Sequence, residues 1–198
     1  PALHFTDRRQ RQMCIRDRLC PMAKLTSSAL QQRLDGMTLP DGARVWMYTA
    51  NRVLTDTECE AVQTALLAFR ESWAAHGTPL RSASVILLNQ VVVLAVDEEP
   101  QIATGCSIDA SVEALRGLNK AAPTLADLDV LDRSWVVYKE EKDAPKWKRA
   151  RLHDFWAMRK AGTLTDDTQN LDSTLTNLGA LRKEGVKRLA DSWHAHMW

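Results

Sequence analysis

Two apolar runs separated by a short polar turn constrain the fold more than any other feature of this chain. Residues 85–88 and 91–96 are rich in β-branched side chains, and Asn89 between them tolerates the left-handed backbone of a tight turn. The pattern predicts a β-hairpin. Both runs are apolar at nearly every position, which is typical of strands buried on both faces. The fold must therefore provide helices that cover at least one face of the sheet.

Strand and helix patterns alternate around this hairpin. Residues 45–48 are β-branched and aromatic and predict a strand. Thr55 and Glu58 fit a capping box, after which apolar residues recur at intervals of three and four, as in a helix. A second helix is predicted after Cys106, and another strand over residues 134–138. The predicted fold is therefore α+β, with the βαββαβ order of a ferredoxin-like sandwich.

The first residues of the chain do not share this patterning. Residues 1–21 are basic and have no apolar period, and residues 13–18 resemble a translated sequencing adapter. We interpret residues 1–21 as a non-native or disordered leader and leave them out of the fold prediction. The alternative is a disordered basic arm that binds nucleic acid.

The rest of the chain divides by composition. Residues 22–43 are polar and contain a cluster of helix breakers, which predicts a linker. Residues 44–198 are expected to form a single α+β domain, with its core in residues 44–140. Residues 150–198 are expected to form a helical extension at the C-terminal end of that domain, broken at its glycines.

Charge and cysteine content exclude several classes of protein. The leader holds five arginines and two aspartates, so without it the net charge changes from +1 to −2, which does not favour nucleic-acid binding. Outside the leader, only Cys59 and Cys106 are left, too few for a disulfide framework. No apolar run is long enough for a membrane span. We expect a cytoplasmic protein with free thiols.

One candidate site lies between the hairpin and the second helix. With Ser107 as the helix N-cap, Cys106 would lie where the helix dipole and free N–H groups stabilise a thiolate, and His194 would act as its base. The alternative is a tight structural corner in which Cys106 packs as a small residue. Gly105, Ser107 and Asp109 would then form part of a binding or structural surface.

Two further positions favour binding. Arg52 follows an asparagine at a strand end, and Trp193 with His194 forms an amphipathic pair near the end of the chain. Residues of these types are common in binding surfaces. The histidines and cysteines lack the spacing of a zinc site, so we expect no metal and no cofactor. The partner would be a protein or a small molecule, and the sequence leaves the oligomeric state open.

Several short segments together resemble an uncharacterised family of short bacterial proteins. They are residues 46–48, 51–52, 94–98, 105–112 and 191–194. The family is common in Bacteroidetes-type genomes and carries the automatic label "ABC transporter ATPase". The resemblance implies a relative and no established activity. The label conflicts with the residues, because a transporter ATPase needs a phosphate-binding loop ending in Gly-Lys-Ser/Thr, and no glycine here is followed by lysine.

Two functions from different classes follow. In the first, the chain is a non-catalytic interaction or regulatory module built around residues 105–109 and the pair Trp193 and His194. In the second, it is a thiol-dependent enzyme or redox sensor that uses Cys106 with His194. The first is preferred because no catalytic signature in the sequence is complete.

Overall fold

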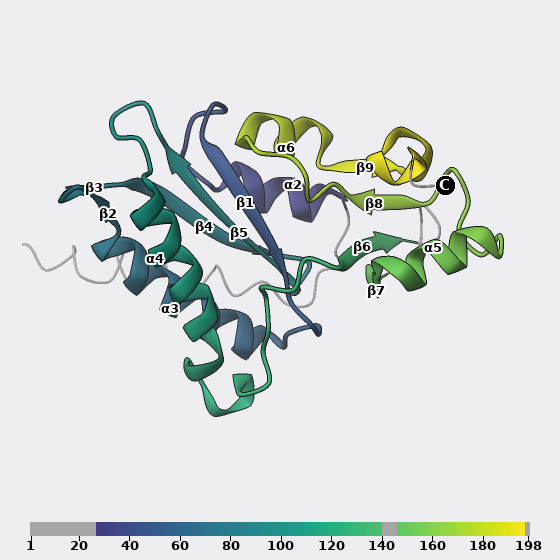
Figure 1. The fold of residues 1–198 in the computed structure, drawn as a ribbon, viewed down its shortest axis with the longest axis horizontal. Coiled ribbons are helices and arrows are strands. Elements are labelled where there is room, and N and C mark those ends of the chain that lie inside the picture. The colour runs from purple at the N-terminus through teal and green to yellow at the C-terminus, as the bar shows by residue number, and fades with distance from the viewer. Residues whose placement is uncertain (1–26, 140–145, 197–198) are drawn as a thin grey trace, which may run out of the picture.

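A computed structural model describes residues 27–139 and 146–196 of the chain, which fold into helices and antiparallel sheets (Figure 1). The α+β class predicted from the sequence is confirmed. The leader predicted over residues 1–21 lies outside the described residues. Within the described part of the chain, no helix is long and apolar enough to cross a membrane.

The first sheet contains the predicted hairpin. Strands β4 (Arg81–Leu87) and β5 (Val91–Asp97) pair antiparallel, and β1 (Arg44–Thr49) pairs with the other side of β5, so the order is β1-β5-β4. Asn89 has the expected left-handed backbone with φ 53°, and Leu88 shares it with φ 56°. Every residue of β5 is buried. The hairpin prediction is confirmed, and β4 begins four residues earlier than the apolar run.

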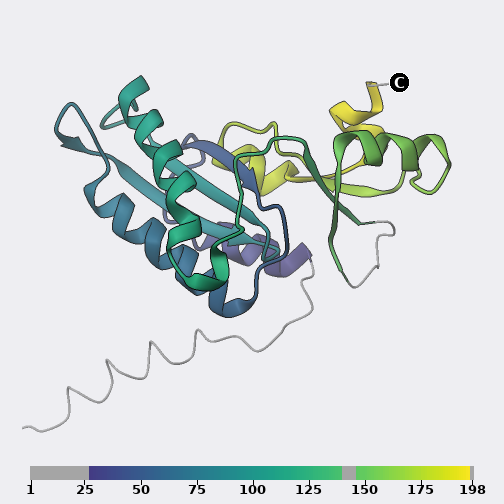
Figure 2. The same ribbon diagram turned by 60° about the horizontal axis from the view of Figure 1, so that its bottom comes forward.

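Helices cover both faces of this sheet, as its apolar composition requires. On one face, α3 (Asp56–Ser72) and α4 (Gly105–Arg116) pack against even-numbered residues of β5 such as Val92. On the other, α2 (Ser27–Asp35) and α6 (Leu178–Glu184) pack against its odd-numbered residues. Figures 1 and 2 show the two pairs of helices on opposite sides of the strands. Alternating side chains of one strand therefore enter two cores.

The start of α3 follows the sequence closely. The Thr55 hydroxyl accepts a hydrogen bond from the backbone N–H of Glu58 at 3.2 Å, and the Glu58 carboxylate accepts one from the backbone N–H of Thr55 at 2.8 Å. This is the predicted capping box, and it satisfies two N–H groups that a helix start leaves unpaired. The helix ends at Ser72. After it, His76 and Gly77 form the left-handed turn of a small hairpin of β2 (Ala74–Ala75) and β3 (Thr78–Pro79).

The linker predicted over residues 22–43 is corrected by the structure where it is described. Leu30 and Leu34 of α2 are buried, and Met37 and Leu39 join the same core. The guanidinium of Arg182 donates to three backbone carbonyls of this segment, including that of Met37 at 2.6 Å. The sequence misled because a helix with two apolar residues is too short to show a period.

A second antiparallel sheet follows, in the order β7-β6-β8-β9. It consists of β6 (Trp135–Lys139), β7 (Lys148–Arg151), β8 (Gln169–Leu171) and β9 (Val186–Arg188), and α5 (Leu152–Lys160) packs on it. The extension predicted as helical is therefore mixed. Strands of three or four largely polar residues leave no alternating pattern in the sequence, so they were read as helical segments.

The second sheet also bears on the ferredoxin-like prediction. That topology needs the strand predicted over residues 134–138 to join the first sheet, whereas β6 pairs with β7 and β8. The ferredoxin-like arrangement is not confirmed. The two sheets share one apolar core, to which β6 contributes Val137 and β8 contributes Leu171. This shared core holds β6 beside β1.

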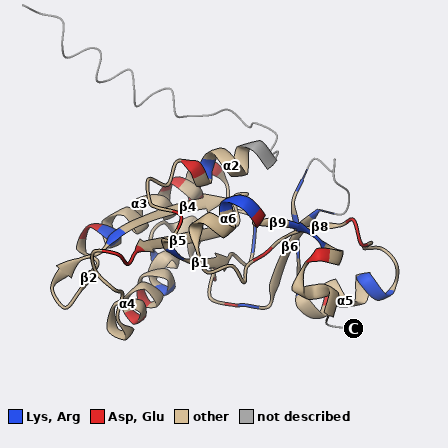
Figure 3. Ribbon diagram, turned by 90° about the horizontal axis from the view of Figure 1, so that it is seen from above, with Lys and Arg blue, Asp and Glu red and all other residues tan. Residues whose placement is uncertain are grey.

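Short 3₁₀ turns complete the described chain. They are η1 (Gly117–Lys120), η2 (Pro123–Leu125), η3 (Leu189–Asp191) and η4 (Trp193–His196). Lysine and arginine alternate with aspartate and glutamate over the ribbon (Figure 3). Many of these charges form ion pairs, such as Lys187 with Asp172 at 3.1 Å.

Candidate functional site

The segment from Gly105 to Asp109 forms a capped helix start. The N-cap is Thr104 and not the expected Ser107, because the helix begins at Gly105. The backbone N–H of Thr104 donates to Ser107 Oγ at 2.8 Å, which makes Ser107 the third residue of a capping box. The side chain of Ser107 is buried, whereas Gly105 and Asp109 are exposed. Ser107 therefore has a structural partner in the chain.

The predicted pair of Cys106 and His194 is not formed. Cys106 is exposed on α4, and His194 is 2% exposed in η4. Figure 1 places α4 and the C-terminal end of the described chain at opposite ends of the molecule. The neighbours of His194 are Phe155 and Trp193, with ring centroids at 5.3 and 4.0 Å. The correction has a simple cause: sequence separation said nothing about distance in space, and η4 packs on the second sheet while α4 packs on the first.

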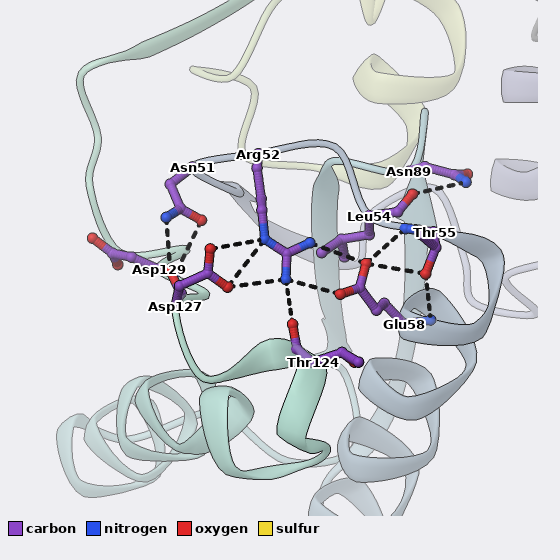
Figure 4. A network of polar contacts seen from close by, with 9 residues as sticks. All are labelled: Asn51, Arg52, Leu54, Thr55, Glu58, Asn89, Thr124, Asp127 and Asp129. Carbon is purple, nitrogen blue, oxygen red and sulfur yellow. Dashed lines mark hydrogen bonds and ion pairs between the residues drawn. The ribbon is translucent and has the colours of Figure 1, made fainter.

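Arg52 lies at the centre of a closed polar network (Figure 4). Its guanidinium donates to both carboxylate oxygens of Glu58 at 2.8 and 3.0 Å, to the Asp127 carboxylate, and to the backbone carbonyl of Thr124 at 2.6 Å. We call these four residues the Arg52 clamp. It joins the loop after β1 to the segment that follows η2.

Electrostatics within the Arg52 clamp favour the charged forms. The hydrogen bond from Arg52 lowers the pKa of Glu58 to about 2, and the Glu58 carboxylate in turn raises the pKa of Arg52. Glu58 is also buried, and its carboxylate caps α3. The donors of Arg52 are therefore occupied within the chain. This places Arg52, predicted as a binding residue, in a structural role.

A groove of about 300 Å³ lies beside β1, between that strand and the residues just before β6 and just after β8. We call it the β1–β6 groove. Trp46, Trp135, Trp193 and Arg133 are among the residues that line it. Its remaining lining comes from three stretches of the chain, namely Val45, Met47, Tyr48 and Thr49; Val130 and Asp132; and Ser173, Thr174, Leu175 and Thr176.

A smaller cavity of about 30 Å³ adjoins the groove. The two share Thr49, Arg133, Trp135, Ser173 and Trp193 as lining residues. His194 lines the small cavity. Trp193 is 37% exposed and stacks on the His194 ring, so it separates the buried imidazole from solvent.

Two buried nitrogen atoms at this place have no hydrogen-bond partner among the described residues. They are Nε1 of Trp135 and Nε2 of His194. Burial lowers the pKa of His194 to about 4, so the ring is neutral at pH 7. Its Nδ1 lies 3.4 Å from the Asn170 amide nitrogen and 3.3 Å from Ser192 Oγ. Buried polar atoms without a hydrogen-bond partner are rare in proteins.

The two charged side chains that line the groove, Asp132 and Arg133, differ in their partners. The Asp132 carboxylate accepts from Ser134 and pairs with Arg151, and the hydrogen bond from Ser134 lowers its pKa. Arg133, in contrast, has no ion pair and no side-chain hydrogen bond with any residue in the described ranges. The groove therefore offers one cation whose charge is not balanced by a neighbour.

No protein-family model, curated protein or solved structure matches this chain. The site must be read from its own geometry. Of the residues predicted from the sequence, Trp193 and His194 lie at the groove or its small cavity, and Arg52 lies in its own clamp. In the described ranges, no three His, Cys, Asp or Glu side chains gather as a metal site requires.

Sequence reasoning missed Arg133, Trp135 and Trp46 as candidate residues. Trp46 and Trp135 stood in predicted strands, where an aromatic residue is ordinary. Arg133 stood in a loop without a motif.

Proposed function

We propose that this chain is a non-catalytic binding module that holds its ligand in the β1–β6 groove. One observation carries the proposal: the Arg133 guanidinium, which has no ion pair within the described ranges, lies at a groove whose lining includes Tyr48 and three tryptophans. Ligand sites in proteins are concave and mostly apolar, with a few polar groups that fix orientation.

The proposal keeps the interaction module predicted from the sequence and moves its centre. Trp193 and His194 stay in the site, while the capped segment with Gly105, Ser107 and Asp109 stabilises α4. The resemblance to the family labelled "ABC transporter ATPase" stays a prediction and adds no activity to this proposal.

The test uses the indole N–H signals of the tryptophans in a ¹H–¹⁵N NMR spectrum. A pool of small aromatic acids, amides and amines is added to the whole chain. We expect members of the pool to shift the signals of Trp135 and Trp193. The signals of Trp73 and Trp147, which lie in the cores, should stay in place.

The matched control compares two tryptophan variants. Trp193→Ala should abolish the shift at Trp135, whereas Trp156→Ala on α5 should leave it unchanged, because Trp156 does not line the groove. If no compound moves either groove signal, or if Trp193→Ala binds as well as the unaltered chain, the groove is not a ligand site and the proposal is wrong.

A further inference from the structure

The edge of β1 inside the groove has free backbone groups. In a strand, successive N–H groups point to opposite sides. The N–H of Val45 points away from β5 and donates to the Thr176 carbonyl at 2.8 Å, and that of Asn51 donates to the Asp129 carbonyl at 2.8 Å. Met47 and Thr49 lie between them with the same orientation. Their N–H groups have no partner among the described residues.

These free groups match an added strand. An extended peptide lying along β1 would accept hydrogen bonds from the N–H groups of Met47 and Thr49 and donate to the carbonyls on the same side. Both residues line the groove, so the space beside this edge is open. Recognition of this kind uses the main chain for affinity and leaves the side chains of the peptide to the rest of the groove.

The length of the gap limits what can enter. The edge is closed at one end by Thr176 and at the other by Asp129. Five residues lie between the two closed positions, Val45 and Asn51, and a strand rises about 3.3 Å per residue, so the open stretch fits about five residues at most. A strand that continued in both directions would have to turn away from the edge at both closing segments, whereas a chain end turns away at one. A chain end therefore fits this gap best.

The charges of the groove favour the carboxyl-terminal end of a peptide over its amino-terminal end. The groove presents the unpaired Arg133 guanidinium, while its one acidic side chain, Asp132, is already held by Ser134 and Arg151. The free N–H groups of Met47 and Thr49 are further donors on the β1 edge of the groove. A carboxylate accepts from such groups in charge-assisted hydrogen bonds, whereas a terminal ammonium would meet a cation and no free acceptor carboxylate.

We propose that the β1–β6 groove captures the carboxyl-terminal end of an extended peptide, which pairs with β1 at Met47 and Thr49 and places its carboxylate on Arg133. This rests on the proposed function, since it names the ligand of the same groove.

The experiment compares two pools of acetylated tripeptides that differ only at the C-terminus, one with a free acid and one with an amide. Affinity is measured by titration of the Trp135 and Trp193 indole signals of the whole chain. We expect the free acids to bind at least about tenfold more tightly. Arg133→Ala should remove that difference, and Arg133→Lys should restore part of it because the charge returns without the bidentate geometry.

The matched control is Arg116→Ala, which removes an exposed arginine at the end of α4 and should keep the preference. Methylation of the peptide backbone nitrogens should weaken binding if the peptide pairs with β1. If acids and amides shift the same signals with equal affinity, the groove binds ligands but carboxylate capture is wrong. If neither pool shifts them while the aromatic pool does, the peptide ligand is wrong and the groove proposal stands. If no pool shifts them, both are wrong.

Discussion

Arg52 and Arg133 contrast two uses of the same side chain around strand β1. Arg52 follows the strand and donates to Glu58, Asp127 and Thr124, so its charge is balanced and its donors are occupied. Arg133 lines the groove beside the strand and has neither an ion pair nor a side-chain hydrogen bond within the described ranges. A satisfied network of this kind holds segments together, whereas an unsatisfied donor in a groove is available to a ligand.

The largest loss of stability should follow from breaking the Arg52 clamp. Arg52→Ala leaves the buried Glu58 carboxylate without its cation and frees the loop after β1 from Thr124. We expect a loss of about 3 kcal/mol in the free energy of unfolding, measured by urea denaturation. Arg116→Ala, which breaks an exposed pair with Glu113, should cost less than about 0.5 kcal/mol. Equal costs for the two variants would contradict a structural clamp.

The next largest effect should be a loss of stability in acid, caused by the buried His194. Burial holds its pKa at about 4 in the fold, below its ordinary value of 6.5, so below pH 6.5 the unfolded chain takes up the proton first. Stability therefore falls as the pH falls through this window, by about 2 kcal/mol between about pH 7 and pH 5. Urea denaturation at several pH values measures this.

His194→Gln is the control for the acid effect, since glutamine cannot titrate and keeps polar atoms beside Asn170. The variant should lose the slope between about pH 7 and pH 5. Glu58 contributes little in that window, because its stabilisation is lost only as the pH falls from its ordinary pKa of 4.5 toward its folded pKa of about 2. A slope that persists in the variant would assign the acid effect to another group.

A smaller effect is expected at the start of α4. Thr104→Ala removes the hydroxyl that accepts from the backbone N–H of Ser107 and should cost about 1 kcal/mol. The same replacement at Thr55 should cost a similar amount, because both residues are N-caps of a capping box. Thermal unfolding checks both. No loss at Thr104 would show that the corner is not held by its cap.

The smallest change in stability should come from replacing Arg133, which has no such network. Arg133→Ala and Cys106→Ser change exposed side chains, and Arg133 has no ion pair within the described ranges. We expect each to change the free energy of unfolding by less than about 0.5 kcal/mol. A loss above about 1 kcal/mol in Arg133→Ala, measured by urea denaturation, would mean that Arg133 supports the fold and that its contrast with Arg52 does not hold.

The sequence predicted the first sheet better than the second. Val91 to Val96 form an apolar run that requires cover on two faces, and Thr55 with Glu58 marks a helix start by itself. In the second sheet, Gln169, Asn170 and Leu171 form a strand of three residues, too short for a readable period. The burial of α2 was missed for the same reason.

The candidate site shows the same limit. Trp193 and His194 could be chosen from the sequence because a tryptophan and a histidine near the end of a polar tail need a place to pack. Arg133 and Trp135 could not, since each was ordinary in its local context. The pairing of His194 with Cys106 failed because nothing in the chain between them reports their separation in space.

The sequence by itself determined the hairpin, the capping box of α3, the presence of α4 and the α+β class, because hydrogen bonds and side-chain periods among near neighbours encode them. Only the tertiary structure decided that β6 belongs to a second sheet and that Arg52 forms ion pairs with Glu58 and Asp127. It alone decided the β1–β6 groove. Its walls come from segments far apart in the chain, and packing in the core shared by both sheets brings them together.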